Sequence, residues 1–264
     1  MSENVRVLVL GDVIGQPGCR ALFSRLRTIL KSNNIDIAVV NGENSANGFG
    51  ITPEIAKQLF SSGVDVITSG NHIWQKREIS PFLDEEKNIL RPANYPAGAP
   101  GRSYCINTRR GYDIAVLNVQ GRIRLGNFNC PFAACREILR KIPQKVKIII
   151  IDFHAESPGE KEALAYYLDG KVSAVLGTHT HVQTADERIL KKGTAFITDL
   201  GMTGPVDSVI GSHKDIAIQR SLTQMPIKME IVNNPSLISG VIVDIEADTG
   251  KSLKISRYYE ELSY

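Results

Sequence analysis

The chain has 264 residues, of which 42% are hydrophobic and 22% are charged. This balance is typical of a globular protein and excludes a disordered, collagen-like or coiled-coil chain. The net charge is only +3 and aromatic residues make up 6%, so the composition does not indicate a basic surface on which bases stack. RNA is a possible partner, but the charge does not indicate it.

The first part of the chain alternates between buried strands and helices. The strands are predicted from nearly continuous runs of apolar, largely β-branched residues, at Val5–Leu10, Ile35–Val40 and Val64–Thr68. One helix is predicted to follow Gly15-Gln16-Pro17 and to run through Lys31, where leucine and isoleucine recur at helical spacing. A second helix is predicted at Pro53–Phe60, with Thr52 as its N-cap and proline at its first position.

The middle of the chain begins with a loop, because Arg91–Gly101 is rich in proline and glycine. Further strands are then predicted at Ser103–Ile106, Asp113–Val119, Lys147–Asp152 and Val172–Leu176. Helices are predicted at Phe132–Ile142 and Glu160–Leu168. The C-terminal part changes character, and antiparallel strands are predicted at Ile227–Val232, Ile238–Ile245 and Ser252–Tyr258.

No linker, repeat or low-complexity tract divides this pattern, so we expect a single domain over residues 1–264. The acidic Glu3 and the short apolar run after it do not make a signal peptide, and no run is long enough to span a membrane. The cysteines lack the spacing of a metal site, which favours reduced, mostly buried thiols at Cys19, Cys105, Cys130 and Cys135. We therefore expect a cytoplasmic protein with no membrane partner.

Residues that can bind a metal ion follow five of the predicted strands. In parallel α/β sheets ligands bind beyond the carboxyl ends of the strands, so residues far apart in sequence are expected to meet there. Four of the five histidines of the chain belong to this group. Its members, in chain order, are Asp12, Glu43, Asn44, Asn71, His72, His154, His179 and His181.

The size and charge of this group suit two metal ions. His179 and His181 are two positions apart, so in an extended segment both imidazoles face the same side. Two histidines, two carboxylates and two amides are more than one ion needs, which suggests two ions about 3.5–4 Å apart that share a carboxylate. Two divalent ions with only Asp12 and Glu43 as anionic ligands leave a positive site, which favours phosphate esters attacked by a bridging hydroxide.

Several of these motifs have simpler interpretations when taken alone. Asp12 after a glycine is typical of a turn or helix cap, Asn71-His72 can be a hydrogen-bonded turn, and His154 by itself is uninformative. His213 follows no predicted strand, so a polar loop is the favoured interpretation. The metal-site hypothesis depends on the motifs occurring together at successive strand ends.

The same motifs resemble those of the calcineurin-like metallophosphoesterases. The shared elements are an acid after the first strand, a bridging acid after the second, Gly-Asn-His after the third, then a lone histidine and a final His-x-His. The sequence departs from that pattern at Ile14, where a histidine is common, and at Glu43, where the usual bridging residue is aspartate.

Those departures are shared with a narrower group, the YmdB-like bacterial phosphodiesterases, which the chain resembles over nearly its whole length. The stretches that carry this resemblance are GDVIGQPG, NGENSANGFGIT, SGNHIW, RPANYP, DFHAE, GTHTHVQTAD and ITDLGMTGP. The resemblance implies a four-layer α/β/β/α sandwich, two metal ions, and hydrolysis of cyclic nucleotide phosphodiesters of the 2',3'-cyclic AMP type. Iron is the expected metal, and manganese or zinc would also suit ligands of this kind.

The resemblance also implies a role for each ligand. One ion would be bound by Asp12, Asn44 and His181, and the other by Asn71, His154 and His179. Glu43 would bridge the two ions. His72 would be the general acid, and it would need help from a phosphate oxygen or a nearby acid to hold its proton beside a cationic site.

Some expectations stay open at this point. Glu156 and Asp199 are candidates for carboxylates that support the ligands, and a surface or turn role is equally compatible with the sequence. Phe49, Trp74 and Tyr95 could flank a base or simply pack in the core, and Arg91, Arg122 and Arg124 could contact phosphate or face solvent. The substrate-binding residues are not identified by the sequence.

The same site could also serve other functions. It could hydrolyse phosphomonoesters or act as a nuclease, because selectivity depends on the shape of the loops. In a different class, the chain could be a regulatory protein that binds metal without turnover. A small-molecule cyclic nucleotide is the expected partner, and a homo-oligomer is a further possibility.

Overall fold

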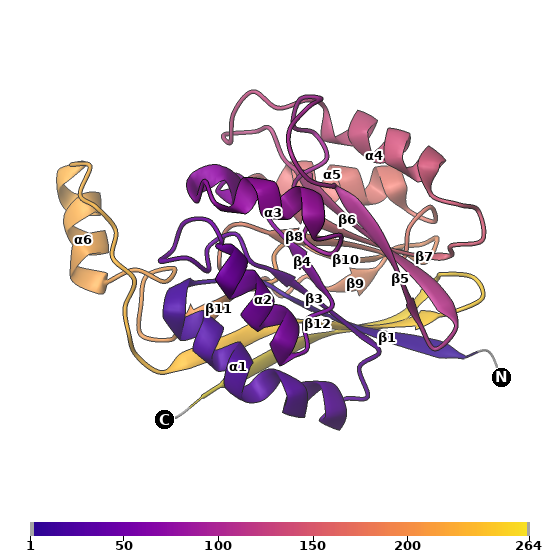
Figure 1. The fold of residues 1–264 in the computed structure, drawn as a ribbon, viewed down its shortest axis with the longest axis horizontal. Helices are drawn as coiled ribbons and strands as arrows, with labels where there is room; N and C mark the ends of the chain where they lie inside the picture. Colours follow the sequence, from indigo (N-terminus) through magenta and orange to yellow (C-terminus); the bar gives the residue numbers. More distant parts are fainter. Residues whose placement is uncertain (1–2, 263–264) are drawn as a thin grey trace.

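A computed structural model describes residues 3–262 and shows two β-sheets packed face to face, with helices on both outer sides (Figure 1). Within the described residues, the first sheet has seven strands in the order β2-β11-β12-β1-β3-β4, with β13 paired to β12. These strands are β1 (Asn4–Leu10), β2 (Asp12–Val13), β3 (Ile37–Asn41), β4 (Val66–Thr68), β11 (Met202–Pro205), β12 (Ser236–Glu246) and β13 (Ser252–Glu261).

The second sheet has six strands in the described part of the chain, in the order β5-β6-β7-β8-β10-β9. They are β5 (Tyr104–Arg109), β6 (Tyr112–Gln120), β7 (Ile148–His154), β8 (Ala174–Thr178), β9 (Arg188–Ile189) and β10 (Ala195–Ile197). The helices are α1 (Gly15–Ser32), α2 (Pro53–Ser62), α3 (Ile79–Glu85), α4 (Pro131–Lys141), α5 (Pro158–Leu168) and α6 (Lys214–Thr223), with a short 3-10 turn, η1 (Ile73–Gln75).

Three buried clusters hold these layers together. Because successive side chains of a strand point to opposite faces, Val7 and Val9 of β1 enter the core between the two sheets, whereas Leu8 and Leu10 enter the core beneath α1 and α2. A third cluster fills the space between the second sheet and helices α4 and α5. The predicted four-layer α/β/β/α sandwich is confirmed.

Most predicted elements are present, and their local signals work as expected. The side chain of Thr52 accepts a hydrogen bond from the backbone N–H of Ile55 and caps α2, which begins at Pro53. Arg91–Gly101 forms a loop, and β12 and β13 pair antiparallel. Within the described residues, none of the helices has both the length and the apolar character needed to cross a lipid bilayer.

The strand predicted at Ile227–Val232 is wrong. This segment has no regular secondary structure and forms one isolated bridge, between Ser212 and Ile231. Its alternation of apolar and polar residues arises for another reason: Met229 and Ile231 face a cavity, whereas Lys228 and Glu230 are exposed. The sequence also gave no prediction for α3, α6 or the short strands β2 and β9–β11.

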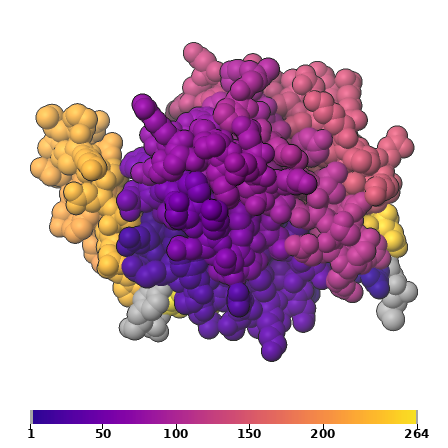
Figure 2. Space-filling view, in the orientation of Figure 1, coloured from indigo at the N-terminus to yellow at the C-terminus, as the bar shows by residue number. Residues whose placement is uncertain are grey.

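Residues 206–235 form an arm that stands off from the sandwich and carries α6. In Figure 1 this segment, drawn in orange to yellow, extends to one side of the first sheet, and Figure 2 shows it as a separate lobe beside the N-terminal part. The arm lies near the sheet edge at which β1 and β3 end.

Candidate metal centre

The predicted ligands lie together at one edge of the two sheets. Strands β1, β3 and β4 run parallel to one another, as do β7 and β8, so their carboxyl ends bring residues from distant parts of the chain to the same place. At the end of β4, Gly70 is required for the close fit, because a Cβ there would lie 2.2 Å from the His154 ring. The structure places the predicted group here: Asp12, Glu43, Asn44, Asn71, His72, His154, His179 and His181.

The first part of the centre surrounds Nε2 of His154. This atom lies 2.8 Å from Oε1 of Glu43, 3.1 Å from Oδ1 of Asn71 and 3.0 Å from Nδ1 of His179. Ligands bound to one ion at about 2.1 Å are themselves about 3 Å apart. Oxygen and nitrogen atoms with this spacing can therefore be the ligands of one metal ion.

Polar contacts behind the histidines determine which ring nitrogens face inward as acceptors. Thr178 donates its hydroxyl to Asp152 (2.7 Å), so its oxygen is free to accept the Nδ1–H of His154 at 3.0 Å. Oε2 of Glu156 lies 3.3 Å from Nε2 of His179, and this contact favours a proton on Nε2 because a carboxylate cannot donate one in return. Both rings thus present a lone pair to the same point, an arrangement that a cation would stabilise.

The pKa values of His154 and Glu43 also indicate that a cation would be stabilised between them. Burial by itself would lower the pKa of His154, but the facing carboxylate of Glu43 raises it to about 9. Burial would raise the pKa of Glu43, yet His154 lowers it to about 2. Without a metal, a proton on His154 supplies the positive charge that the surrounding acceptors need.

The second part of the centre surrounds the side-chain amide of Asn44. Its Nδ2 lies 3.3 Å from Oδ1 of Asp12, 3.4 Å from Oε1 of Glu43 and 3.2 Å from Nε2 of His181. A half-turn of the amide exchanges this nitrogen for Oδ1, which would complete a set of four potential metal ligands. Oε1 of Glu43 belongs to both parts of the centre, so Glu43 is placed to bridge two ions.

His181 is oriented from outside the sandwich. Its Nδ1 donates a hydrogen bond of 2.9 Å to the backbone carbonyl of Ile210 in the arm, since a carbonyl oxygen can only accept. This hydrogen bond leaves Nε2 of His181 as an acceptor that faces Asp12 and Asn44. Desolvation in the buried site raises the pKa of Asp12 to about 6, and a nearby cation would restore its charge.

The His179–His181 loop has an unusual backbone. His179 and His181 have φ values of 107° and 65°, in the left-handed region that residues other than glycine rarely adopt. Two buried carboxylates hold this loop: Asp12 accepts the backbone N–H of His179 at 3.1 Å, and Asp199 accepts that of Thr180 at 3.0 Å. Asp199 in turn pairs with the buried Nζ of Lys161 at 2.7 Å. Lys161 was not predicted to belong to the site.

His72 lies at the edge of the centre, beside the bridging carboxylate. Its backbone N–H donates to Oε2 of Glu43 at 3.0 Å, and its Nε2 lies 3.2 Å from the amide nitrogen of Asn71. The buried Nδ1 has no hydrogen-bond partner among the described residues. Burial lowers the pKa of His72, so a proton on this ring needs an anionic ligand nearby.

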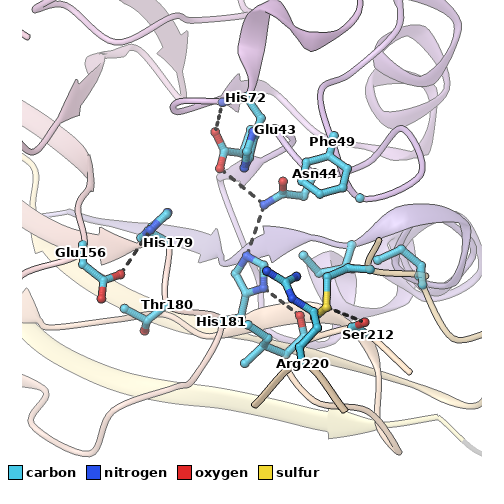
Figure 3. A pocket seen from close by; sticks show the side chains of 15 residues that line it. Glu43, Asn44, Phe49, His72, Glu156, His179, Thr180, His181, Ser212 and Arg220 are labelled. Atoms are coloured by element: carbon cyan, nitrogen blue, oxygen red, sulfur yellow. Dashed lines mark hydrogen bonds and ion pairs between the residues drawn. The ribbon is translucent and has the colours of Figure 1, made fainter. Parts of the chain in front are cut away.

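A cavity of about 470 Å³ opens onto the centre, which is within the size range of small-molecule sites. Figure 3 shows Glu43, Asn44, His179 and His181 on its wall, with Arg220 of the arm beside His181. Arg220 and the apolar side chains of the arm were missed, because nothing in the sequence places residues 206–235 next to the strand ends.

Other candidate residues have different places. Phe49 lines the cavity, and its ring packs edge-on against the ring of His72, with the two ring centroids 5.0 Å apart. Trp74 and Tyr95 instead pack against each other and the core beneath the helices. The guanidinium of Arg91 donates to carbonyls of its own loop, and His213 is the residue that precedes α6.

Comparison with known proteins gives a consistent result. A family model described as "YmdB-like protein" matches residues 8–258. The chain is 44% identical, over 256 residues and 96% of both chains, to a Bacillus subtilis protein named 2',3'-cyclic-nucleotide 2'-phosphodiesterase.

Solved structures resemble the fold as well. A crystal structure of a phosphatase from Mycoplasma pneumoniae superposes with a TM-score of 0.93 at 30% identity, covering 99% of this chain and 95% of the other. The NAD nucleotidase of Haemophilus influenzae superposes with a TM-score of 0.64 at 14% identity, covering 99% of this chain and 57% of the other, a likeness of fold alone.

Proposed function

Because this chain belongs to the YmdB-like protein family, we propose that it is a metal-dependent phosphoric diester hydrolase acting on 2',3'-cyclic nucleotides. The name of the Bacillus subtilis relative supports the substrate. The observation that carries the proposal is the convergence of ligand atoms around Glu43, whose Oε1 lies near both His154 and Asn44.

The donor set fits two metal ions. Asp12, Asn44 and His181 would hold one ion, Asn71, His154 and His179 would hold the other, and Glu43 would bridge them. When bound, the ions supply Lewis acidity and lower the pKa of water, so that a nucleophile forms near neutral pH. The mixture of nitrogen and oxygen ligands without thiolate suits iron best in this proposal, with manganese or zinc as alternatives.

The chain itself contributes proton transfer and orientation. Water adds to phosphorus as the bond from phosphorus to the ribose 2'-oxygen breaks, and that oxygen takes a proton to give a nucleoside 3'-phosphate. We assign this proton to His72, which lies next to the bridging carboxylate. Since burial lowers the pKa of His72, the negative charge of the bound phosphate would raise that pKa and keep the ring protonated.

Metal analysis of Glu43→Gln and His154→Ala tests the centre directly. Both variants should retain the fold by circular dichroism, bind less metal than the parent by elemental analysis, and lose hydrolysis of 2',3'-cyclic AMP under added Mn²⁺ or anaerobic Fe²⁺. An exposed substitution such as Lys145→Gln is the matched control. If Glu43→Gln kept two ions and full activity, the bridging role of Glu43 would be wrong.

Hydrolysis of phosphomonoesters is a second candidate on the same site, favoured by the name of the Mycoplasma pneumoniae structure. Rates on 2',3'-cyclic AMP, adenosine 3'-phosphate and short RNA, measured with the same metal-loaded preparation, distinguish cyclic phosphodiesterase, phosphomonoesterase and nuclease activity. A faster rate on the monoester than on the cyclic diester would favour the second candidate.

A further inference from the structure

We propose that the arm and Phe49 form a nucleoside-binding wall, which makes the metal centre selective for nucleoside cyclic phosphates over small phosphoesters in general. The inference rests on the proposed function, because it describes how that site holds the rest of its substrate. The wall consists of Phe49 with Ile210, Met229 and Ile231 of the arm.

The wall and the metal ligands line one cavity. Asn44, His179 and His181 line it together with the apolar side chains of the wall, and Figure 3 shows Phe49 beside Asn44. A phosphate held at the polar residues would place the attached ribose and base within the same cavity. The cavity is large enough for a mononucleotide and far larger than a bare phosphate needs.

The chemistry of the wall suits the flat, apolar faces of a base. Phe49 is 43% exposed and Ile210 is 47% exposed, although aromatic and branched side chains of this size are usually covered. A base that stacks on an aromatic ring gains binding energy without needing a specific hydrogen bond. Phe49 also touches the His72 ring, so a base seated on it would lie close to the general acid.

The arm is seated firmly enough to act as a fixed wall. Ile231 lies directly over Gly48, where a Cβ would come within 2.8 Å of its side chain, and Gly48 has a φ of 87°. The two stems of the arm are joined by a hydrogen bond of 2.9 Å from the N–H of His213 to the carbonyl of Glu230. Because the arm also holds His181 through Ile210, the wall and the metal centre are fixed relative to each other.

Arg220 adds a cation to the same cavity. It is the one lysine or arginine that lines the cavity in the described part of the chain, and its side chain makes no hydrogen bond or ion pair with another described residue. A planar guanidinium can stack on a base or donate to its edge, which a lysine ammonium cannot do equally well. We assign Arg220 to the nucleoside, since the metal ions would already balance the single charge of the cyclic phosphate.

Two substrates with the same reacting ring test the wall. 2',3'-Cyclic AMP carries a nucleoside, whereas ethylene phosphate is a five-membered cyclic diester without one. In metal-loaded enzyme, Met229→Ala/Ile231→Ala and, separately, Phe49→Ala should each raise KM for 2',3'-cyclic AMP about tenfold. The loss of kcat/KM on ethylene phosphate should be several-fold smaller. Arg220→Ala should behave in the same way, and Arg220→Lys should recover only part of the loss.

Leu222→Ala is the matched control, because Leu222 belongs to α6, is 80% exposed and does not line the cavity. It should leave both substrates unaffected. Equal losses on both substrates, or no loss on either, in the wall variants would overturn the inference while leaving the proposed function intact.

Binding of adenosine 3'-phosphate, measured by calorimetry, tests the nucleoside-binding wall independently of the proposed function. If the parent hydrolyses neither cyclic diester but the wall variants weaken this binding, the wall is supported and the proposed function fails. If the wall variants bind adenosine 3'-phosphate as tightly as the parent, the wall is wrong.

Discussion

The ring of His181 takes its orientation from a carbonyl 29 residues further along the chain, that of Ile210. His154 is oriented in the same manner by a hydrogen bond to Thr178, and His179 has the carboxylate of Glu156 3.3 Å behind its Nε2. Each of these contacts favours a proton on one ring nitrogen and leaves the other free for the metal ion that we propose. At the scale of single residues, the centre depends on hydrogen-bond partners as much as on the ligands themselves.

His72→Ala should separate catalysis from metal binding. The variant should keep the metal content of the parent and lose at least about a hundredfold in kcat on 2',3'-cyclic AMP, because general acids contribute about 10²–10⁴-fold. Elemental analysis and steady-state rates on the same preparation are the measurements. A diester with a nitrophenolate leaving group, which needs no proton, should be hydrolysed with a much smaller loss, and a parent-like rate on 2',3'-cyclic AMP would refute the assignment of His72.

The thiols give a test at the same scale that is independent of the site. Burial raises the pKa of Cys19, Cys105 and Cys135 to about 12, and the thiolate is the reactive form. Iodoacetamide at pH 8 should therefore label at most the half-buried Cys130 in the folded protein. Mass spectrometry should find all four cysteines labelled after unfolding in urea. Labelling of two or more sites in the folded chain would contradict this expectation.

That the proposed ligand residues lie together could be predicted from the sequence for a physical reason. They directly follow or end buried apolar runs, and such runs form strands whose ends meet at one edge. Among the residues that support the ligands, the carboxylates Glu156 and Asp199 were candidates from the sequence, whereas other partners could not be predicted. Lys161 and Ile210 come close to the centre only through tertiary packing, and neither belongs to a residue type that signals a metal site.

At the scale of secondary structure, the elements that could not be predicted from the sequence are the short strands and the arm. Strands β1, β3, β6 and β7 are long, buried and β-branched, so their sequences alone indicate them. Strands β2, β9, β10 and β11 have two to four residues each, too few to show a period. At Ile227–Val232 the opposite happened, and a strand was predicted where none forms. Apolar and polar residues alternate there because one side of the segment lines a cavity, not because the segment belongs to a sheet.

The pair between Lys161 of α5 and Asp199 after β10 links these elements to the His179–His181 loop. Both side chains are buried, so Lys161→Met should leave Asp199 unpaired and lower the free energy of unfolding by about 3–5 kcal/mol. It should also weaken metal binding, because Asp199 holds the backbone N–H of Thr180. Urea unfolding and metal titration are the measurements.

The control for that prediction is another lysine pair. Lys145 pairs with Asp113 at 2.8 Å on the surface, where its side chain is 76% exposed, so Lys145→Met should change stability little. Equal effects of the two variants would show that the Lys161–Asp199 pair has no special structural role.

The molecule as a whole is a sandwich whose first sheet contains both the first and the last strand of the described residues, β1 and β13. Strand β12 lies between β11 and β1, with β1 paired to β12 over seven residue positions from Asn4 to Leu10. The core between the sheets likewise combines residues from β1 with residues from β7 and β8. We propose that the two sheets belong to one domain, as the sequence predicted.

Thermal unfolding tests this proposal. One calorimetric transition is expected, with circular dichroism and tryptophan fluorescence changing together, because neither sheet can lose the core between them without exposing the other. Metal should shift that single transition upward, as any ligand that binds only the folded chain does. Two resolved transitions would indicate separate folding units.

The place of β12 also bears on how the protein is made. By the time a ribosome has added His181, every proposed metal ligand has been synthesised. Of the two strands that pair with β1, however, β12 begins only at Ser236. The sheet beside Asp12 therefore cannot be completed before Ser236–Glu246 has been synthesised, since pairing between distant segments follows the synthesis of both. If the proposed metal centre is right, we expect stable metal binding only after β12 has been synthesised, although every proposed ligand precedes this strand.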